Sequence, residues 1–207
     1  TFSLMVNNSA PSFTPAPAIT RQQGSPGGAA VVVGSVSDGQ TAAGSLSVTQ
    51  IAGGSSSGVS ASGISNAAGS ISSTIAASCT ATAGTLRFQV SDGALNGTGN
   101  LQVNINANTP PTLAYAAANL NLGAGVAVNP TTGPSDNGSV ASVALFSAGT
   151  YTGGISVASN GVVTLTNAAP VGAHTINIAA TDNCGSTQNA TFTLTVTQSG
   201  IFANGFE

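Results

Sequence analysis

The chain has 207 residues and almost no positive charge: two arginines and no lysine stand against four aspartates and one glutamate. This composition excludes the basic surface that nucleic-acid binding requires. No apolar run approaches the roughly 18 residues that cross a bilayer as a helix, so the sequence predicts no membrane span. So neutral a surface also lacks the charge repulsion that keeps soluble proteins apart, which favours self-association.

The pattern of side chains indicates an all-β protein. Gly, Ala, Ser, Thr, Asn and Val dominate, aromatic residues make up 4%, and tryptophan is absent. Short stretches in which apolar and polar residues alternate are separated by Gly, Asn-Gly and Asp-Gly turns. Alternation of this kind is typical of half-buried β-strands joined by tight turns.

The first alternating stretch reads like the last strand of a domain. In TFSLMVN, at residues 1–7, apolar side chains alternate with polar ones and end at Val6. Similar strands end at Ile105 and Val196, so the three lie about 100 and about 90 residues apart, the size of an immunoglobulin-like domain. The sequence therefore predicts two complete units preceded by a single extra strand.

Other landmarks repeat in the two units. Each final strand follows another alternating strand that leads to an aspartate, TLRFQVSDG at 85–93 and HTINIAATDN at 174–183. Shorter strands precede these, giving about seven strands per unit, which is the number in an immunoglobulin-type sandwich. We expect two tandem immunoglobulin-like β-sandwich domains.

The predicted boundaries follow from these landmarks and from a proline-containing linker, ANTPP. They are an orphan or donor strand at 1–8, a first domain at 9–107, a second domain at 108–198 and a C-terminal tail at 199–207.

The stretches VNPTTGPSDNGSVASV and NGVVTLTNAAPVGAHTINIAATDNCGSTQNATFTLTV, with the linker NTPP, carry a resemblance. They resemble the immunoglobulin-like and cadherin-like repeats of large bacterial secreted and surface proteins, closely over 108–198 and more loosely over 9–107. This resemblance implies a tandem array outside the cell, usually in a stalk, an adhesin or a filament, and no particular ligand. The core tryptophan and the cysteine pair within one domain, both typical of antibody domains, are missing.

Four aspartates fall at equivalent positions, Asp38 and Asp92 in the first unit and Asp136 and Asp182 in the second. Loops between the second and third strands and between the sixth and seventh strands share one end of an immunoglobulin sandwich, so each pair is a candidate for binding Ca²⁺. Asp-Gly and Asp-Asn are also ordinary turn sequences. Two carboxylates supply few of the six to eight oxygen ligands of Ca²⁺, which favours turns and no bound metal.

The sequence offers no catalytic group, and we expect neither enzymatic activity nor a cofactor. GSSSG at 54–58 fits the Gly-x-Ser-x-Gly pattern around Ser56, but that motif requires a strand–turn–helix and this stretch is a low-complexity loop. His174 begins a strand and has no carboxylate near it in sequence, so it forms no acid–base pair.

A regular row of threonines occupies the last predicted strand, at Thr191, Thr193, Thr195 and Thr197. These hydroxyls are candidates for binding ice or a sugar. Threonine is also a favoured residue on the solvent face of a strand, and this reading is preferred.

The two cysteines are expected to form one disulfide. Cys79 is predicted between the fifth and sixth strands of the first unit, and Cys184 between the sixth and seventh strands of the second. In consecutive sandwiches these loops are expected at facing ends, where a bond needs Cα atoms within about 7 Å. Free thiols or a bond between subunits are the alternatives. A disulfide favours an oxidising, secreted or cell-surface location.

The favoured function is a structural subunit of an extracellular filament or surface appendage, with other copies of itself as partners. Residues 1–7 are expected to extend a sheet in a neighbouring subunit, because a lone strand is unstable in water. The residues expected at this subunit contact are Phe2, Leu4 and Val6, together with Ile201, Phe202 and Phe206 of the tail.

Three other interpretations stay open. Residues 1–7 are alternatively the end of an upstream repeat in a longer array. The chain is alternatively the stalk or ligand-binding module of a bacterial adhesin that recognises a glycan or a host protein, or a non-catalytic array on a secreted enzyme. Adhesive surfaces usually carry aromatic or charged residues, and the loops here contain mainly Gly, Ser, Ala and Asn.

Overall fold

A computed structural model describes residues 7–198. The chain forms two compact units, with the boundary between Asn108 and Thr109. Over the described residues the secondary structure is β-strand apart from one 3-10 turn, Ala43–Ser45, which confirms the all-β prediction. The residues expected at a subunit contact, which are Phe2, Leu4, Val6, Ile201, Phe202 and Phe206, lie outside the described part.

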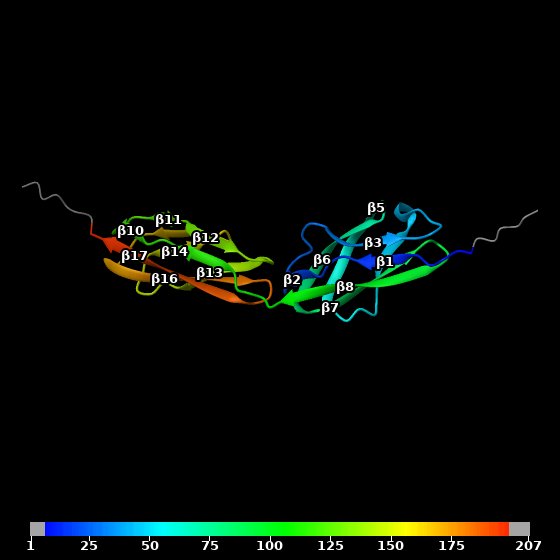
Figure 1. The fold of residues 1–207 in the computed structure, drawn as a ribbon. Helices are drawn as coiled ribbons and strands as arrows, with labels where there is room; N and C mark the ends of the chain where they lie inside the picture. The colour runs from blue at the N-terminus through cyan, green and yellow to red at the C-terminus, as the bar shows by residue number, and fades with distance from the viewer. Residues whose placement is uncertain (1–6, 199–207) are drawn as a thin grey trace, which may run out of the picture. The chain divides into compact units, whose positions relative to one another are not determined.

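The first unit is a sandwich of two four-stranded sheets (Figure 1). One sheet has the order β1 (Ser12–Pro15), β3 (Val31–Ser37), β6 (Ser70–Thr82), β5 (Ser57–Ala67). The other has the order β2 (Ile19–Gln22), β8 (Asn96–Asn106), β7 (Gly84–Ser91), β4 (Ser47–Ile51). All neighbours are antiparallel except β2 and β8. This is the strand order of an immunoglobulin-like sandwich whose first strand contributes to both sheets.

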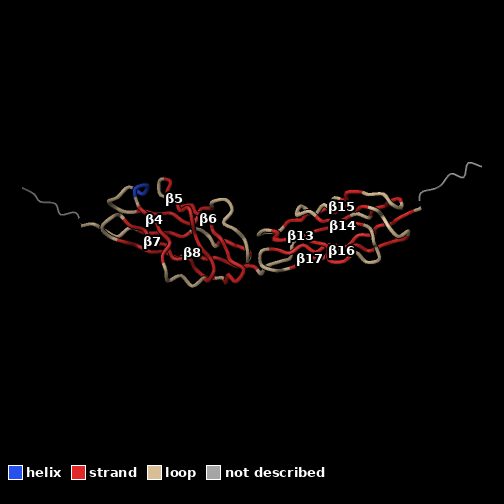
Figure 2. The backbone as a smooth tube through the Cα atoms, turned by 180° about the vertical axis from the view of Figure 1, so that it is seen from behind, coloured by secondary structure: helices blue, strands red, loops and turns tan. Residues whose placement is uncertain are grey.

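The second unit has the same topology with one more interruption. Figure 2 shows β16 and β17 side by side in the sheet ordered β10 (Ala118–Asn121), β17 (Thr187–Thr197), β16 (Gly172–Asp182), β13 (Val140–Ser147). The facing strands are β11 (Val126–Val128), β15 (Val163–Thr166) and β14 (Gly154–Val157), and β12 (Pro130–Ser135) pairs with β9 (Thr112–Tyr115). Because β11 and β12 follow each other directly, they form one strand that is interrupted at Asn129.

Over the described residues the units thus contain eight and nine strands where about seven were expected, because the first strand of each unit and the strand at β11 and β12 are divided. Proline accounts for two of the three divisions, because it removes a backbone donor from a ladder. Pro17 lies in the gap where the first strand crosses from one sheet to the other, and Pro130 follows the interruption at Asn129. The expected pattern of two tandem immunoglobulin-like sandwiches is confirmed, with its strands divided at these points.

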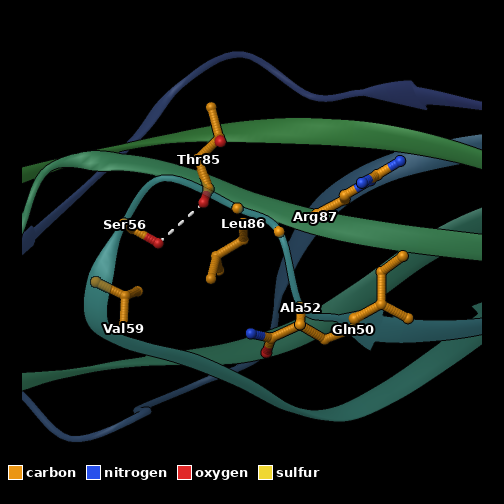
Figure 3. Close-up of a pocket in the computed structure, with 10 residues that line it drawn as sticks. Gln50, Ala52, Ser56, Val59, Thr85, Leu86 and Arg87 are labelled. Atoms are coloured by element: carbon orange, nitrogen blue, oxygen red, sulfur yellow. Dashed lines mark hydrogen bonds between the residues drawn. The ribbon is translucent and has the colours of Figure 1, made fainter.

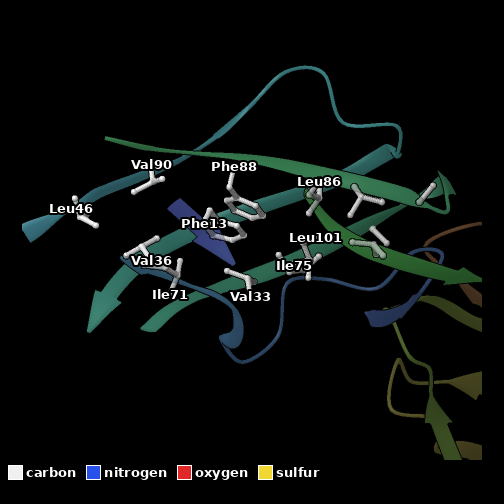
Figure 4. Close-up of a cluster of buried hydrophobic side chains, with 14 residues drawn as sticks. Phe13, Val33, Val36, Leu46, Ile71, Ile75, Leu86, Phe88, Val90 and Leu101 are labelled. Carbon is white, nitrogen blue, oxygen red and sulfur yellow. The ribbon is translucent and has the colours of Figure 1, made fainter. Parts of the chain in front are cut away.

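Each unit has its own hydrophobic core, formed by alternate residues of its strands. In the first unit the ring of Phe13 stacks on Phe88, with 5.2 Å between centroids, at the centre of the cluster in Figure 4. In the second unit the rings of Tyr115 and Phe192 lie 5.3 Å apart. Fully buried aliphatic side chains surround them, such as Ile178 of β16. Each core thus comprises residues of a single unit.

Candidate functional site

In the first unit, Asp92 is engaged by its own turn between β7 and β8. One carboxylate oxygen accepts the backbone N–H groups of Ala94 and Leu95, both at 2.7 Å, and the other accepts Asn8 Nδ2 at 2.8 Å. The N–H groups of Leu95 and Ala94, with the Asn8 amide, hold the pKa of this carboxyl below its ordinary value of 3.8. The stabilisation is therefore present at neutral pH and is lost as the pH falls through the lowered pKa.

Asp38 has the same role in the loop between β3 and β4. Its Oδ2 accepts the backbone N–H groups of Gln40 at 3.1 Å and Thr41 at 2.7 Å. Desolvation raises the pKa of Asp38, but the backbone N–H groups of Thr41, Gln40 and Gly39 outweigh it, and the net pKa is lowered. Both carboxylates of the first unit thus hold turns.

The segment just before β1 connects these two loops. Gln40 Oε1 accepts the Ser9 hydroxyl at 2.7 Å and the Ser9 backbone N–H at 3.2 Å. Asn8 reaches the neighbouring loop through its bond to Asp92. This end of the first unit is therefore a polar, hydrogen-bonded loop surface.

The equivalent loops of the second unit also meet. The Asn183 backbone N–H donates to the Ser139 carbonyl at 2.9 Å, and the Ser139 N–H donates to Asn183 Oδ1 at 3.2 Å. Asp136 accepts the backbone N–H of Gly138 at 2.9 Å. Asp182 is buried, and its Oδ1 accepts the backbone N–H groups of Cys184 at 2.8 Å and Ser186 at 2.9 Å. The loops converge as expected, and each carboxylate holds its own turn.

Within residues 7–198, these loops do not bring together enough ligands for a metal site. The described residues contain no group of three or more His, Cys, Asp or Glu side chains that could hold a metal ion. The first unit does leave one carboxylate oxygen, Asp38 Oδ1, buried without a hydrogen-bond partner. One such oxygen falls far short of the six to eight ligands that Ca²⁺ takes, so binding of calcium finds no support in this geometry.

Ser56 lies in the loop that leads into β5, not at a strand–turn–helix. Its hydroxyl donates to the Thr85 carbonyl at 3.0 Å, which fixes the loop to β7 (Figure 3). A hydroxyl held in this way has no base to activate it.

His174 is buried in β16 and both of its ring nitrogens are hydrogen-bonded. Nε2 lies 2.8 Å from the Pro170 carbonyl, so it carries the proton, and Nδ1 accepts the Thr150 hydroxyl at 2.8 Å. The ring packs against that of Tyr151 in a T-shaped arrangement, with 5.6 Å between centroids. These contacts give His174 a structural role, joining the loop between β13 and β14 to the loop between β15 and β16.

A small hollow in the first unit was not indicated by the sequence. It has a volume of about 140 Å³ and is lined by Gln50, the glycine loop at 53–54, Ser56 and Arg87 (Figure 3). Arg87 donates to Thr98 Oγ1 at 3.4 Å and has no carboxylate partner among the described residues. This volume is below that of typical small-molecule binding sites, so the hollow could hold only part of a ligand, such as a single functional group.

The threonine row lies on the outer face of β17, as its spacing predicts. Thr191, Thr193 and Thr197 are exposed and Thr195 is half-buried, while Phe192 and Leu194 between them are buried. The row pairs across the sheet with Thr175, which lies opposite Thr193. This face is polar and uncharged.

Both cysteines are disulfide-bonded, and no free cysteine occurs in the described part of the chain. Cys184 lies in the turn between β16 and β17, as expected. Cys79 does not lie in a loop, as the sequence had indicated, but inside β6. The strand continues past Cys79 because Ala77 and Ala81 on either side of it stay buried against the core.

Peptide mapping of unreduced protein is expected to give one linked pair of peptides, containing Cys79 and Cys184, from monomeric chains. The chain has two cysteines and both are bonded, so one intrachain bond satisfies both. Mapping after reduction is the control, in which the linked pair should separate. Linked peptides found only in covalent dimers would show instead that the bond joins subunits.

The comparisons concern fold. No protein-family model matches the sequence, and no curated protein matches it. Across residues 7–198, none of the helical structure is long and apolar enough to cross a membrane.

Solved structures with a similar arrangement share little sequence with the chain. The titin domains Z1Z2 in complex with telethonin are 17% identical, with a TM-score of 0.42, covering 94% of this chain and all of that one. Human protocadherin-24 EC1-2 is 14% identical, with a TM-score of 0.35. The match covers 94% of this chain and 100% of that one. An endo-fucoidan hydrolase of glycoside hydrolase family 107 is 10% identical, with a TM-score of 0.47, and only 30% of that chain is covered, against 95% of this one. The assignment of two tandem immunoglobulin-like sandwiches rests on the strand order within each unit.

Proposed function

We propose that the chain is a structural subunit of an extracellular filament or surface appendage, assembled head-to-tail by β-strand addition. The disulfide supports an oxidising location outside the cytosol. The resemblance of the sequence to bacterial surface repeats supports a bacterial origin. The proposal includes no catalysis, because the described candidates Ser56 and His174 are each held in structural hydrogen bonds.

One observation carries the proposal: each unit already contains its own final strand, paired on both sides. In the first unit β8 lies between β2 and β7, and in the second β17 lies between β10 and β16. The position to which TFSLMVN corresponds in sequence is therefore occupied in both units. A strand with alternating apolar residues gains stability only by joining a sheet, which favours pairing with another copy of the chain.

The composition supports assembly. The whole chain contains only two arginines and five acidic residues, so copies meet little electrostatic repulsion. The aromatic and aliphatic residues of the tail, Ile201, Phe202 and Phe206, are proposed to contribute to the same contact between subunits.

Deletion of residues 1–6 is expected to abolish assembly while leaving both units folded. The deletion keeps Asn8 and Ser9, whose hydrogen bonds hold the loops of the first unit. Sedimentation velocity and electron microscopy of the intact and shortened chains measure the effect. Replacing Phe2, Leu4 and Val6 together with serine should have the same result as the deletion, whereas Ser3→Thr should assemble normally.

If the shortened chain forms the same particles as the intact chain, strand donation is wrong and residues 1–7 belong to an upstream repeat. The alternative function, a ligand-binding module of an adhesin, is favoured by one feature, the polar hollow beside Arg87, whose described hydrogen bond is to the Thr98 hydroxyl. A chain that stays monomeric under all conditions and binds a glycan would support that alternative.

A further inference from the structure

The strand β13 lies at the edge of a sheet in the second unit and has no charged residue. Among the described strands it is hydrogen-bonded to β16 alone, so its other side has no ladder partner, although β14 approaches it without pairing. Its eight residues, VASVALFS, contain no proline and no charged residue, two of the devices that usually keep an edge strand from pairing with other chains, although the strand does carry two β-bulges. An edge of this kind is a ready template for another strand.

The apolar inner face of β13 is incompletely covered. Val140, Val143 and Leu145 pair with residues of β16 that are fully or almost fully buried, namely Asp182, Ala180 and Ile178. On β13 itself, Val140 and Val143 are half-buried and Leu145 is 40% exposed. The core is therefore closed at β16 and left open along β13.

The equivalent edge of the first unit is shorter and partly covered. There β4 has five residues, and Gln50 of β4 accepts the Ala61 backbone N–H of β5 at 2.6 Å. The long edge strand β5 is mainly Ser, Gly and Ala, and so offers little apolar surface beside a new strand. Of the remaining edge strands, β1, β2, β9, β10 and β14 have four residues each, β11 has three, and β12 has six, two of which are prolines. The apolar edge of eight residues is thus particular to the second unit.

We propose that the free edge of β13 is the acceptor for residues 1–6 of a second copy of this chain. The proposal rests on the function proposed above and specifies the surface that receives the strand. Phe2, Leu4 and Val6 recur at every second position, so they share one face of an extended strand and can cover Val143 and Leu145. The added strand would occupy the position at which variable-type immunoglobulin domains add a strand to the same sheet.

Two bulges define where the ladder can form. Ala141 and Phe146 are extra residues in β13, because the register with β16 shifts at each of them. Between them Ser142–Leu145 is regular and spans about 13 Å, which matches four residues of a donor strand. Phe146 is 66% exposed beside this stretch and offers an aromatic contact at one end of the added strand.

The test compares Leu145→Lys with Val32→Lys in the full-length chain. Val32 lies in β3 of the first unit and is 54% exposed, so it accepts the same charge change away from the proposed edge. A charge beside the donor residues Phe2, Leu4 and Val6 should weaken assembly more than about tenfold. We expect this loss for Leu145→Lys and none for Val32→Lys. Unchanged assembly of Leu145→Lys overturns the proposal.

A second measurement does not depend on a variant of β13. The synthetic peptide TFSLMVN is added to the chain that lacks residues 1–6, and amide hydrogen exchange is followed residue by residue. Slower exchange is expected at alternate amides of Ser142–Leu145, those that point away from β16, since these gain a ladder partner. Protection of another strand instead overturns β13 as the acceptor while strand donation stands. Absence of binding, with assembly of the shortened chain unchanged, refutes the proposed function itself.

Discussion

Replacement of Phe13 by alanine is expected to lower the free energy of unfolding of the first unit by about 3–5 kcal/mol. The ring is 7% exposed, stacks on Phe88, and lies against glycines from both sheets, Gly34 of β3 and Gly99 of β8. Because this ring bridges the two layers, its removal leaves a cavity that backbone on either side cannot fill by small shifts.

The two units can be followed separately in this experiment. Both tyrosines, Tyr115 and Tyr151, belong to the second unit, and the chain has no tryptophan. Tyrosine fluorescence should therefore show an unchanged denaturant midpoint for the second unit, while circular dichroism shows an earlier transition for the first. Phe13→Leu is the matched control and should lose less than half as much. A parallel loss in the tyrosine signal would contradict separate cores.

The second large effect is expected from adding a single methyl group at Gly99. A Cβ there would lie 2.5 Å from a ring carbon of Phe13 and 2.9 Å from the Phe13 carbonyl oxygen. Gly99→Ala should therefore destabilise the first unit by about 1–3 kcal/mol through overpacking. Gly39→Ala is the control, because its Cβ would meet only Ser9 Oγ at an ordinary 3.6 Å.

A double-mutant cycle identifies the cause. In the Phe13→Ala background the ring carbon is gone, so Gly99→Ala should cost markedly less than in the parent chain. Denaturant unfolding of the four proteins gives the coupling between the sites. Strictly additive losses would show that the methyl group collides with backbone and not with the ring.

Much of the fold could be predicted from local sequence pattern. Alternation of apolar residues indicated the long strands, as in β17, where Phe192 and Leu194 are buried and the threonines between them face outward. Asp-Gly and Asp-Asn indicated the turns at Asp38, Asp92 and Asp136, and their carboxylates do accept backbone N–H groups there. These features depend on neighbours within a few residues, which the sequence displays directly.

The features that the sequence did not predict depend on distant strands. Cys79 lies within β6 because Ala81, two residues further, is buried by the core, and nothing next to Cys79 shows that. The open edge at β13 follows from the order of the sheet and not from the letters VASVALFS. The hollow beside Arg87 arises where the loop after β4 crosses β7, and the residues that meet there, Ser56 and Thr85, are 29 positions apart.

The placement of the two arginines has a consequence for proteolysis. Arg21 lies in β2, paired with Ile105, and Arg87 lies in β7, paired with Asn100 and Ile51. Trypsin cleaves after lysine or arginine, and both of its sites in this chain are thus held in strands of the first unit. Cleavage requires those strands to open, so the rate of digestion measures local unfolding of the first unit. The second unit, which contains neither residue type, stays in one piece in trypsin whether it is folded or not.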